Sequence, residues 1–203
     1  MIIPALLESS LASLKTKVQL FEQISPLLHV DFGDSKFVEL KSEFTIEDVA
    51  NLTTSAKLQV HLMCLNPENQ IQKKYNSIDS VIFHAEAVKN YLKTAQVFHL
   101  LGYKVGICVN LRTPPPDYFD KIDFIQFMGV IPGKQHGIFD QTVIKKIHKF
   151  NNSMPTLPIQ VDGGLNSTNI PDLINAGAST FAVGSFILKA ESHIQAYKEL
   201  CGI

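Results

Sequence analysis

The sequence lacks the marks of several classes of protein. Its 203 residues carry 18 basic and 19 acidic side chains, and no block of like charge predicts a nucleic-acid surface. No apolar run approaches the roughly 18 residues of a membrane-spanning helix, and residues 1–8 contain no basic side chain that would open a secretory signal. We therefore expect a small-molecule partner, with no nucleic acid and no membrane.

Two further motifs are missing. Cys64, Cys108 and Cys201 are an odd, scattered set without the spacing of a metal or redox site, which is typical of small buried side chains in a reducing cytoplasm. No Gly-x-Gly-x-x-Gly follows the first strand-like run, so an open sheet that binds a dinucleotide loses its main support. We expect a cytoplasmic protein.

What the sequence does have is a regular alternation of two patterns. Eight apolar runs have the length of a β-strand, at residues 2–6, 27–31, 58–62, 80–83, 105–109, 124–127, 159–161 and 180–183. Stretches with helical spacing follow many of them, at residues 11–24, 88–101, 143–150, 170–176 and 192–200. The second and fifth connections look short and irregular. Strand followed by helix predicts parallel strands with right-handed crossovers, in an open doubly wound sheet or a closed barrel.

Four polar residues at the ends of these runs favour the barrel. His29 and Asp31 are two apart, so they point to the same face of one strand; His61 lies near the end of another run, and Asp162 directly follows a third. Such residues converge on the shared C-terminal rim of an α/β TIM (β/α)8 barrel, for which roughly 200 to 250 residues is a normal length. We expect one such domain over residues 1–203. Two imidazoles and two carboxylates suit Zn²⁺, and Fe²⁺, Mn²⁺ or Co²⁺ are tolerated.

Seven blocks of sequence, in order, resemble the ribulose-phosphate 3-epimerase family along nearly the whole chain. They are His29-Val-Asp-Phe-Gly-Asp-Ser-Lys-Phe-Val38, Val60-His-Leu-Met63 with Asn66-Pro-Glu68, Phe83-His-Ala-Glu-Ala87, Gly102-Tyr-Lys-Val-Gly106, Met128-Gly-Val-Ile-Pro-Gly133, Val161-Asp-Gly-Gly164, and residues 177–185. One block alone would be a weak signal, whereas seven in order are specific. The resemblance implies a ribulose-phosphate binding barrel, an isomerase of the pentose phosphate pathway.

The resemblance also implies roles for the four polar residues. His29, Asp31, His61 and Asp162 match the ligands of one catalytic divalent metal ion. Asp31 and Asp162 match the acid/base pair, which exchanges a proton at the carbon beside the ketone on opposite faces of the sugar, through a metal-stabilised ene-diolate. His84 and Glu86 match a His-x-Glu motif, which we expect to support the site rather than to catalyse.

A set of residues around this centre is expected to hold the substrate. Met63 and Met128 match apolar positions around the family's bound sugar, Asp34 matches a further acidic position, and Gly133 lies in the loop that closes over the substrate. Backbone amides at turns favour an anion, and barrels often bind phosphate with the loops after strands 7 and 8. We therefore expect phosphate at Gly163, Gly164, Gly184 and Ser185.

Departures from the family pattern fall in this substrate shell. Ala5 replaces a serine, Gly33 replaces a methionine and opens room beside the reacting carbon, and Lys134, Gln135 and His136 lie in a loop that is glycine-rich in the family. Three functions remain open: epimerisation of D-ribulose 5-phosphate to D-xylulose 5-phosphate, the same chemistry on another ketose phosphate such as allulose 6-phosphate, or a non-catalytic phosphosugar-binding barrel. The retained aspartate pair favours the first. Family members are commonly homo-oligomers.

Overall fold

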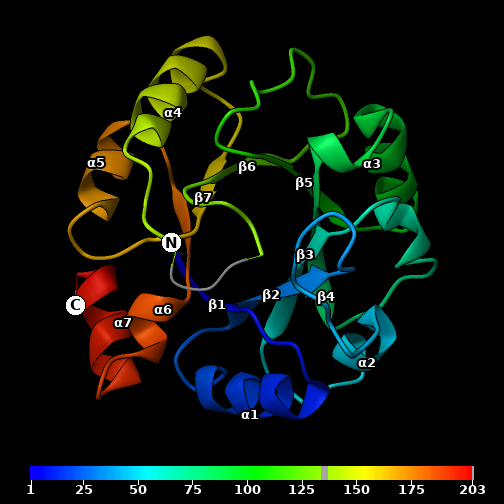
Figure 1. Ribbon diagram of the computed structural model, residues 1–203, viewed down its shortest axis with the longest axis vertical. Helices are drawn as coiled ribbons and strands as arrows, with labels where there is room; N and C mark the ends of the chain where they lie inside the picture. Colours follow the sequence, from blue (N-terminus) through cyan, green and yellow to red (C-terminus); the bar gives the residue numbers. More distant parts are fainter. Residues whose placement is uncertain (134–136, 203) are drawn as a thin grey trace.

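Eight parallel strands close into a barrel in the order β1-β2-β3-β4-β5-β6-β7-β8 in the computed structural model, which describes residues 1–133 and 137–202 (Figure 1). The strands are β1 (Ile2–Leu6), β2 (Leu27–Gly33), β3 (Lys57–Met63), β4 (Ile78–His84), β5 (Lys104–Val109), β6 (Phe124–Met128), β7 (Ile159–Asp162) and β8 (Thr180–Val183). The barrel closes where Ile2 pairs with Phe181. The predicted TIM barrel is confirmed, and the open sheet is excluded.

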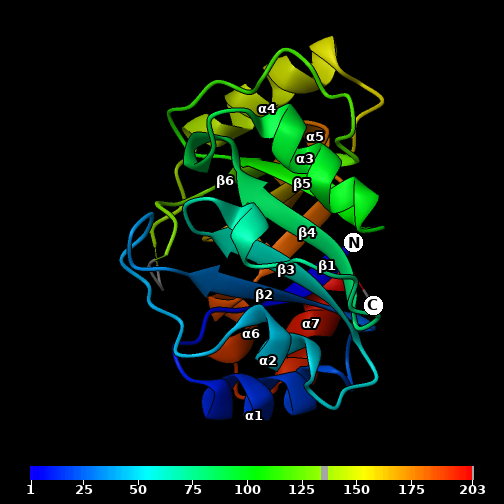
Figure 2. The ribbon, with the colours of Figure 1, turned by 90° about the vertical axis from the view of Figure 1, so that its right-hand side faces the viewer.

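Helices surround the barrel as an outer layer (Figures 1 and 2). They are α1 (Leu11–Phe21), α2 (Ile46–Ala50), α3 (Tyr91–Leu100), α4 (Thr142–Ser153), α5 (Ile170–Asn175), α6 (Ser185–Leu188) and α7 (His193–Cys201), with single 3₁₀ turns η1 (Pro67–Asn69) and η2 (Ala85–Ala87). Residues 110–123, all of them described, form no helix. The short α2 and this irregular segment match the expectation for the second and fifth connections.

Polar side chains just before α1, α2, α3 and α7 fix where these helices begin. Ser10, Asn90 and Ser192 each accept a hydrogen bond from the backbone N–H three residues on. Thr45 does the same and its own N–H is bonded by Asp48, which makes a capping box. Each cap satisfies an amide that the helix itself leaves unpaired, so the start of the helix is set locally by the sequence.

Two apolar regions result from the alternation of side chains along the strands. Outward-facing residues pack against the helices; Phe83 on β4, for example, meets Phe98 on α3 with ring centroids 5.9 Å apart. Inward-facing residues, including Ile82 and Cys108, form a smaller cluster inside the barrel. The extensive outer core leaves the barrel interior free to carry polar groups. Across the part of the chain that the structure describes, no helix combines the length and hydropathy that a membrane crossing requires.

Candidate active site

Three of the four predicted ligands lie side by side on two neighbouring strands. His29 and Asp31 share the inner face of β2, and the register of the sheet places Asp31 directly opposite His61 on β3. His61 Nδ1 is 2.8 Å from Asp31 Oδ1, and His29 Nε2 is 3.4 Å from the same oxygen. One carboxylate oxygen therefore faces both imidazoles.

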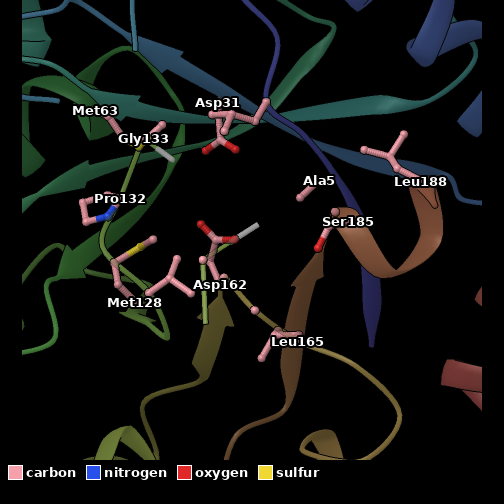
Figure 3. Close-up of a pocket in the computed structure, with 16 residues that line it drawn as sticks. Ala5, Asp31, Met63, Met128, Pro132, Gly133, Asp162, Leu165, Ser185 and Leu188 are labelled. Carbon is pink, nitrogen blue, oxygen red and sulfur yellow. The ribbon is translucent and has the colours of Figure 1, made fainter. Parts of the chain in front are cut away.

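Asp162 completes this group from the end of β7. Its Oδ2 is 3.6 Å from His61 Nδ1 and 3.8 Å from His29 Nε2. One ligand atom from each of the four residues lies within 4.8 Å of the others. Figure 3 shows the carboxylates of Asp31 and Asp162 pointing toward one another across a cavity. The structure thus brings together all four residues that the sequence singled out.

The two histidines present different ring nitrogens to the carboxylates. His29 Nδ1 donates to Gln59 Oε1 at 2.8 Å, which leaves Nε2 directed at Asp31 and Asp162. This Nε2 is buried and has no hydrogen-bond partner among the described residues. Since buried polar atoms are normally paired, an unpaired nitrogen facing two carboxylates fits a ligand position for a cation. Together with the mixed nitrogen and oxygen donors, it shows that this group suits a divalent metal.

Burial and mutual charge shift the pKa values in this group strongly. Burial by itself would lower the pKa of His29, but the close approach and negative charge of Asp31, with the charge of Asp162, outweigh it and raise that pKa to about 9. Burial would raise the pKa of Asp31, and the two histidines instead hold it well below its ordinary range. Burial and the charge of Asp31 raise the pKa of Asp162 to about 6. The two carboxylates therefore differ in proton affinity.

A layer of glutamines beneath this group was missed in the sequence. Gln160 Nε2 donates to Gln59 Oε1 at 2.8 Å and to Gln126 Oε1 at 2.7 Å, and all three side chains are buried. Gln59 lies two residues before His61, and Gln160 lies two residues before Asp162. The period of two along a strand places each glutamine on the inner face, one layer below a site residue. A polar residue two positions before a site residue in a buried strand would have indicated this layer in the sequence.

The substrate-shell residues gather around one cavity of about 690 Å³, its open mouth included. Its lining contains Asp31 and Asp162, the predicted substrate-lining residues Met63, Met128 and Gly133, and the residues predicted to bind phosphate, Gly163, Gly164, Gly184 and Ser185. Ala5 and Ser185 lie on one side of it, opposite Pro132 and Gly133 (Figure 3). Leu7, Val130, Leu165 and Leu188 also contribute apolar wall that the sequence did not single out.

Asp34 is not among the described residues that line this cavity. Its Oδ1 accepts hydrogen bonds from the backbone N–H groups of Lys36 and Phe37, both at 2.8 Å, and its Oδ2 accepts one from Leu65 at 2.9 Å. Although burial works against it, these bonds lower the pKa of Asp34. The structure thus gives Asp34 a local task, which is to tie the loop after β2 to the end of β3.

The expectation that Gly33 opens room for a larger sugar is wrong. A Cβ placed on Gly33 would lie 2.5 Å from the carbonyl oxygen of Leu40, and Gly33 is not among the described lining residues. The backbone at Leu40 fills the space that the missing side chain leaves. Ala5, in contrast, does line the cavity. The altered residues Lys134, Gln135 and His136 lie outside the described residues.

Known proteins resemble this chain in sequence along most of its length. The sequence profile of the ribulose-phosphate 3 epimerase family matches residues 1–188. The chain belongs to this family. Membership places it among the epimerases, within the isomerase class of enzymes, and confirms the resemblance that the seven sequence blocks indicate.

Individual relatives of this epimerase span its length. Ribulose-phosphate 3-epimerase of Bacillus subtilis is 28% identical over 212 residues, which cover 99% of the chain and 98% of the relative. The chloroplastic ribulose-5-phosphate-3-epimerase of Arabidopsis thaliana is 30% identical over 207 residues, which cover 96% and 74%. A mutant tryptophan synthase α-subunit from Pyrococcus furiosus superposes with a TM-score of 0.72 over 100% and 98% of the two chains, at 17% identity. This last likeness shows a shared barrel fold alone.

Proposed function

We propose that this epimerase inverts carbon 3 of D-ribulose 5-phosphate to give D-xylulose 5-phosphate. The observation that carries the proposal is the pair of carboxylates, Asp31 from β2 and Asp162 from β7, that face each other across the cavity (Figure 3). Inversion requires that one group removes a proton from one face of the carbon and another group returns a proton to the opposite face. Two facing carboxylates meet this requirement. Their unequal pKa values suit a pair in which one carboxylate accepts a proton from the carbon and the other returns one to it.

The same residues can hold the cation that such a reaction uses. We assign His29 Nε2, His61 Nδ1, Asp31 and Asp162 as its ligands, because these atoms already converge. Zn²⁺ fits this donor set best, with Fe²⁺, Mn²⁺ and Co²⁺ as alternatives. When bound, the ion supplies Lewis acidity that makes the carbon beside the ketone a stronger acid. Met63 and Met128 provide apolar walls that exclude water from the reacting carbon.

The phosphate of the substrate is assigned to the loops after β7 and β8. Gly163, Gly164, Gly184 and Ser185 line the cavity, whereas no lysine or arginine occurs among the described lining residues. Gly163 and Gly164 have φ values of +100° and +71°, a conformation that glycine adopts readily and that lets a backbone approach a ligand closely. Recognition by backbone N–H groups and the Ser185 hydroxyl is therefore proposed.

A coupled assay tests the proposed reaction. Purified protein is supplied with Zn²⁺, Mn²⁺ or Fe²⁺ and D-ribulose 5-phosphate, and D-xylulose 5-phosphate is detected through transketolase. Product should form with at least one of these metals and should stop forming after chelation. If no metal supports product formation, the proposed substrate is wrong.

Deuterium exchange separates the remaining alternatives. Several ketose phosphates, allulose 6-phosphate included, are incubated with the metal-loaded protein in deuterated water. Exchange at the carbon beside the ketone of another sugar, without exchange in ribulose 5-phosphate, would indicate the same chemistry on that sugar. Binding of a phosphosugar without any exchange would indicate a non-catalytic barrel. The filled space at Gly33 gives no support to a larger sugar.

The compartment and the oligomeric state complete the proposal. All three cysteines are free thiols, two buried and one exposed, which agrees with a reducing cytoplasm as the compartment. A homo-oligomer is proposed from the resemblance to the family, and sedimentation velocity of the purified protein would measure its state.

A further inference from the structure

A chain of polar groups leads away from the proposed metal centre on the far side of His61, through the buried His84 to the partly exposed side chain of Glu86. His61 Nε2 is 3.0 Å from His84 Nε2, and the two imidazole rings are stacked with centroids 5.0 Å apart. His84 is the last residue of β4 and is fully buried. Beyond it, Glu86 Oε2 lies 3.4 Å from His84 Nδ1, an ion-pair distance without an aligned hydrogen bond.

The chemistry of imidazole fixes how protons can be arranged along this chain. A hydrogen bond between two ring nitrogens needs a proton on one and a lone pair on the other. When His61 offers the lone pair of Nδ1 to a cation, the single proton of the neutral ring is on Nε2. His61 must then donate to His84 Nε2, and the proton of His84 must be on Nδ1, where it faces Glu86.

Glu86 is suited to receive that proton as a hydrogen bond. Its Oε1 already accepts the backbone N–H of Asn110 at 2.8 Å, which holds the carboxylate in place. Burial would raise the pKa of Glu86, but its interactions with His84, Thr113 and the backbone N–H of Asn110 outweigh it and lower the pKa to about 2. Glu86 is therefore ionised, and a fixed anion beside Nδ1 favours the His84 tautomer protonated there.

We propose that His84 and Glu86 are a positioning pair that holds His61 with Nδ1 toward the metal. The pair acts through His61 and touches neither substrate nor metal. This inference rests on the metal ligands of the proposed function. His29 has a separate support of the same kind, since Gln59 accepts from its Nδ1 and leaves Nε2 for the metal. Carboxylate or carbonyl partners on the second ring nitrogen are the usual means by which proteins orient histidine ligands.

Metal affinity is the first measurement. The dissociation constant for Zn²⁺ is obtained by competition with a chromophoric chelator for the unmodified protein, His84→Leu, His84→Gln and Glu86→Gln. His84→Leu leaves the His61 Nε2 proton without an acceptor, so the constant should rise roughly 10- to 100-fold. His84→Gln keeps an acceptor for His61 and a donor for Glu86, so it should recover most of the loss. Glu86→Gln should raise the constant about 10-fold.

Cys108→Ser is the matched control. Cys108 is as buried as His84 and pairs with it in the sheet, but its Sγ accepts a hydrogen bond from Gln126 at 3.6 Å. The Zn²⁺ affinity of the Cys108→Ser variant should stay within about threefold of that of the unmodified protein. This change is well under the one expected when a supporting partner of a ligand is lost. Since His61, His84 and Cys108 could themselves hold a metal, a second metal equivalent that Cys108→Ser removes would overturn the proposal, because His84 would then be a ligand.

Nuclear magnetic resonance reads the tautomers directly. Long-range ¹H–¹⁵N correlation spectra of the Zn²⁺-loaded protein should show His61 protonated on Nε2 and His84 protonated on Nδ1, with the His84 signals identified by their absence in His84→Gln. A His84 ring protonated on Nε2 would overturn the proposal, whatever the affinities. If His84→Leu does not fold, Glu86→Gln and these spectra carry the test.

The outcomes also separate this inference from the proposed function. If the unmodified protein binds no divalent metal, the proposed metal centre is wrong and the positioning pair is wrong with it. If it binds Zn²⁺ tightly but Glu86→Gln and His84→Leu leave the affinity unchanged, the metal centre stands and only the positioning pair is overturned.

Discussion

At the scale of single residues, the proposed site gives more than one role to the same side chain. Asp31 and Asp162 are each proposed both as a ligand and as a proton carrier, and each is almost completely buried. A buried carboxylate that is neither paired nor bound to a cation is costly. The histidines offset that cost for Asp31 more than for Asp162. The pKa of Asp31 is therefore lowered, whereas the pKa of Asp162 is raised.

Asp162→Asn should lower kcat for ribulose 5-phosphate by several orders of magnitude. The amide neither accepts the substrate's proton nor supplies an anionic ligand, so one proton carrier and one ligand disappear together. The coupled transketolase assay measures the loss. Asp172→Asn, an exposed change on α5, serves as control and should keep the activity of the unmodified protein. Near-normal turnover in Asp162→Asn would contradict the two-carboxylate scheme.

At the scale of strands and loops, much of the fold could be predicted because burial in a parallel sheet leaves a clear sequence pattern. The predicted runs 2–6 and 180–183 coincide with β1 and β8. Helix ends were less well predicted: the stretch 11–24 ends as α1 at Phe21, and 88–101 begins as α3 only at Tyr91. The apolar periodicity of the sequence extends past these ends, so periodicity alone overestimates the length of each helix.

The site was predictable where residues stand at strand ends, and less so where the packing of a loop decides. His29, Asp31, His61 and Asp162 converge because the strands that carry them are in register. The surroundings of Asp34 and Gly33 depend on the path of residues 35–42. This segment folds back so that Ser42 N–H donates to Gly33 O at 2.9 Å. No local pattern in the sequence indicates that return.

Gly33→Ala should destabilise the fold and leave the choice of sugar unchanged. Its Cβ would be 2.5 Å from Leu40 O, so the loop after β2 must shift, which costs on the order of 1 to 3 kcal/mol of the free energy of unfolding. Urea unfolding measures this cost, and relative kcat/KM values for ketose phosphates measure the preference. A stable variant with a changed sugar preference would show that Gly33 borders the substrate after all.

At the scale of the whole molecule, the outer core between strands and helices holds the barrel independently of its polar interior. The protein should therefore remain folded without metal, and Zn²⁺ should raise its Tm in a concentration-dependent manner, because a ligand that binds only the native state stabilises it. Differential scanning calorimetry tests this. His61→Ala should remove the dependence of Tm on Zn²⁺. An increase in Tm as large in His61→Ala as in the unmodified protein would contradict the ligand assignment.

Acid stability should report the environment of Glu86. Its pKa falls from 4.5 to about 2 on folding, so its ionised form stabilises the native state above pH 4.5, and this contribution is lost as the pH falls toward 2. The difference in free energy of unfolding between the unmodified protein and Glu86→Gln should thus shrink as the pH falls from 4.5 toward 2. Urea unfolding at a series of pH values measures it; a difference independent of pH would contradict the assigned environment.

The seam between β1 and β8 sets an order of events during synthesis of the chain. Ala5 comes from the first strand and Gly184 from the end of the last, and a Cβ on Gly184 would lie 3.1 Å from Ala5 O. Both residues line the same cavity. Because chains emerge from the ribosome N-terminus first, this cavity has no complete wall until Gly184 has been made. A nascent chain that stops before Gly184 therefore presents no finished pocket in which a sugar phosphate could be trapped.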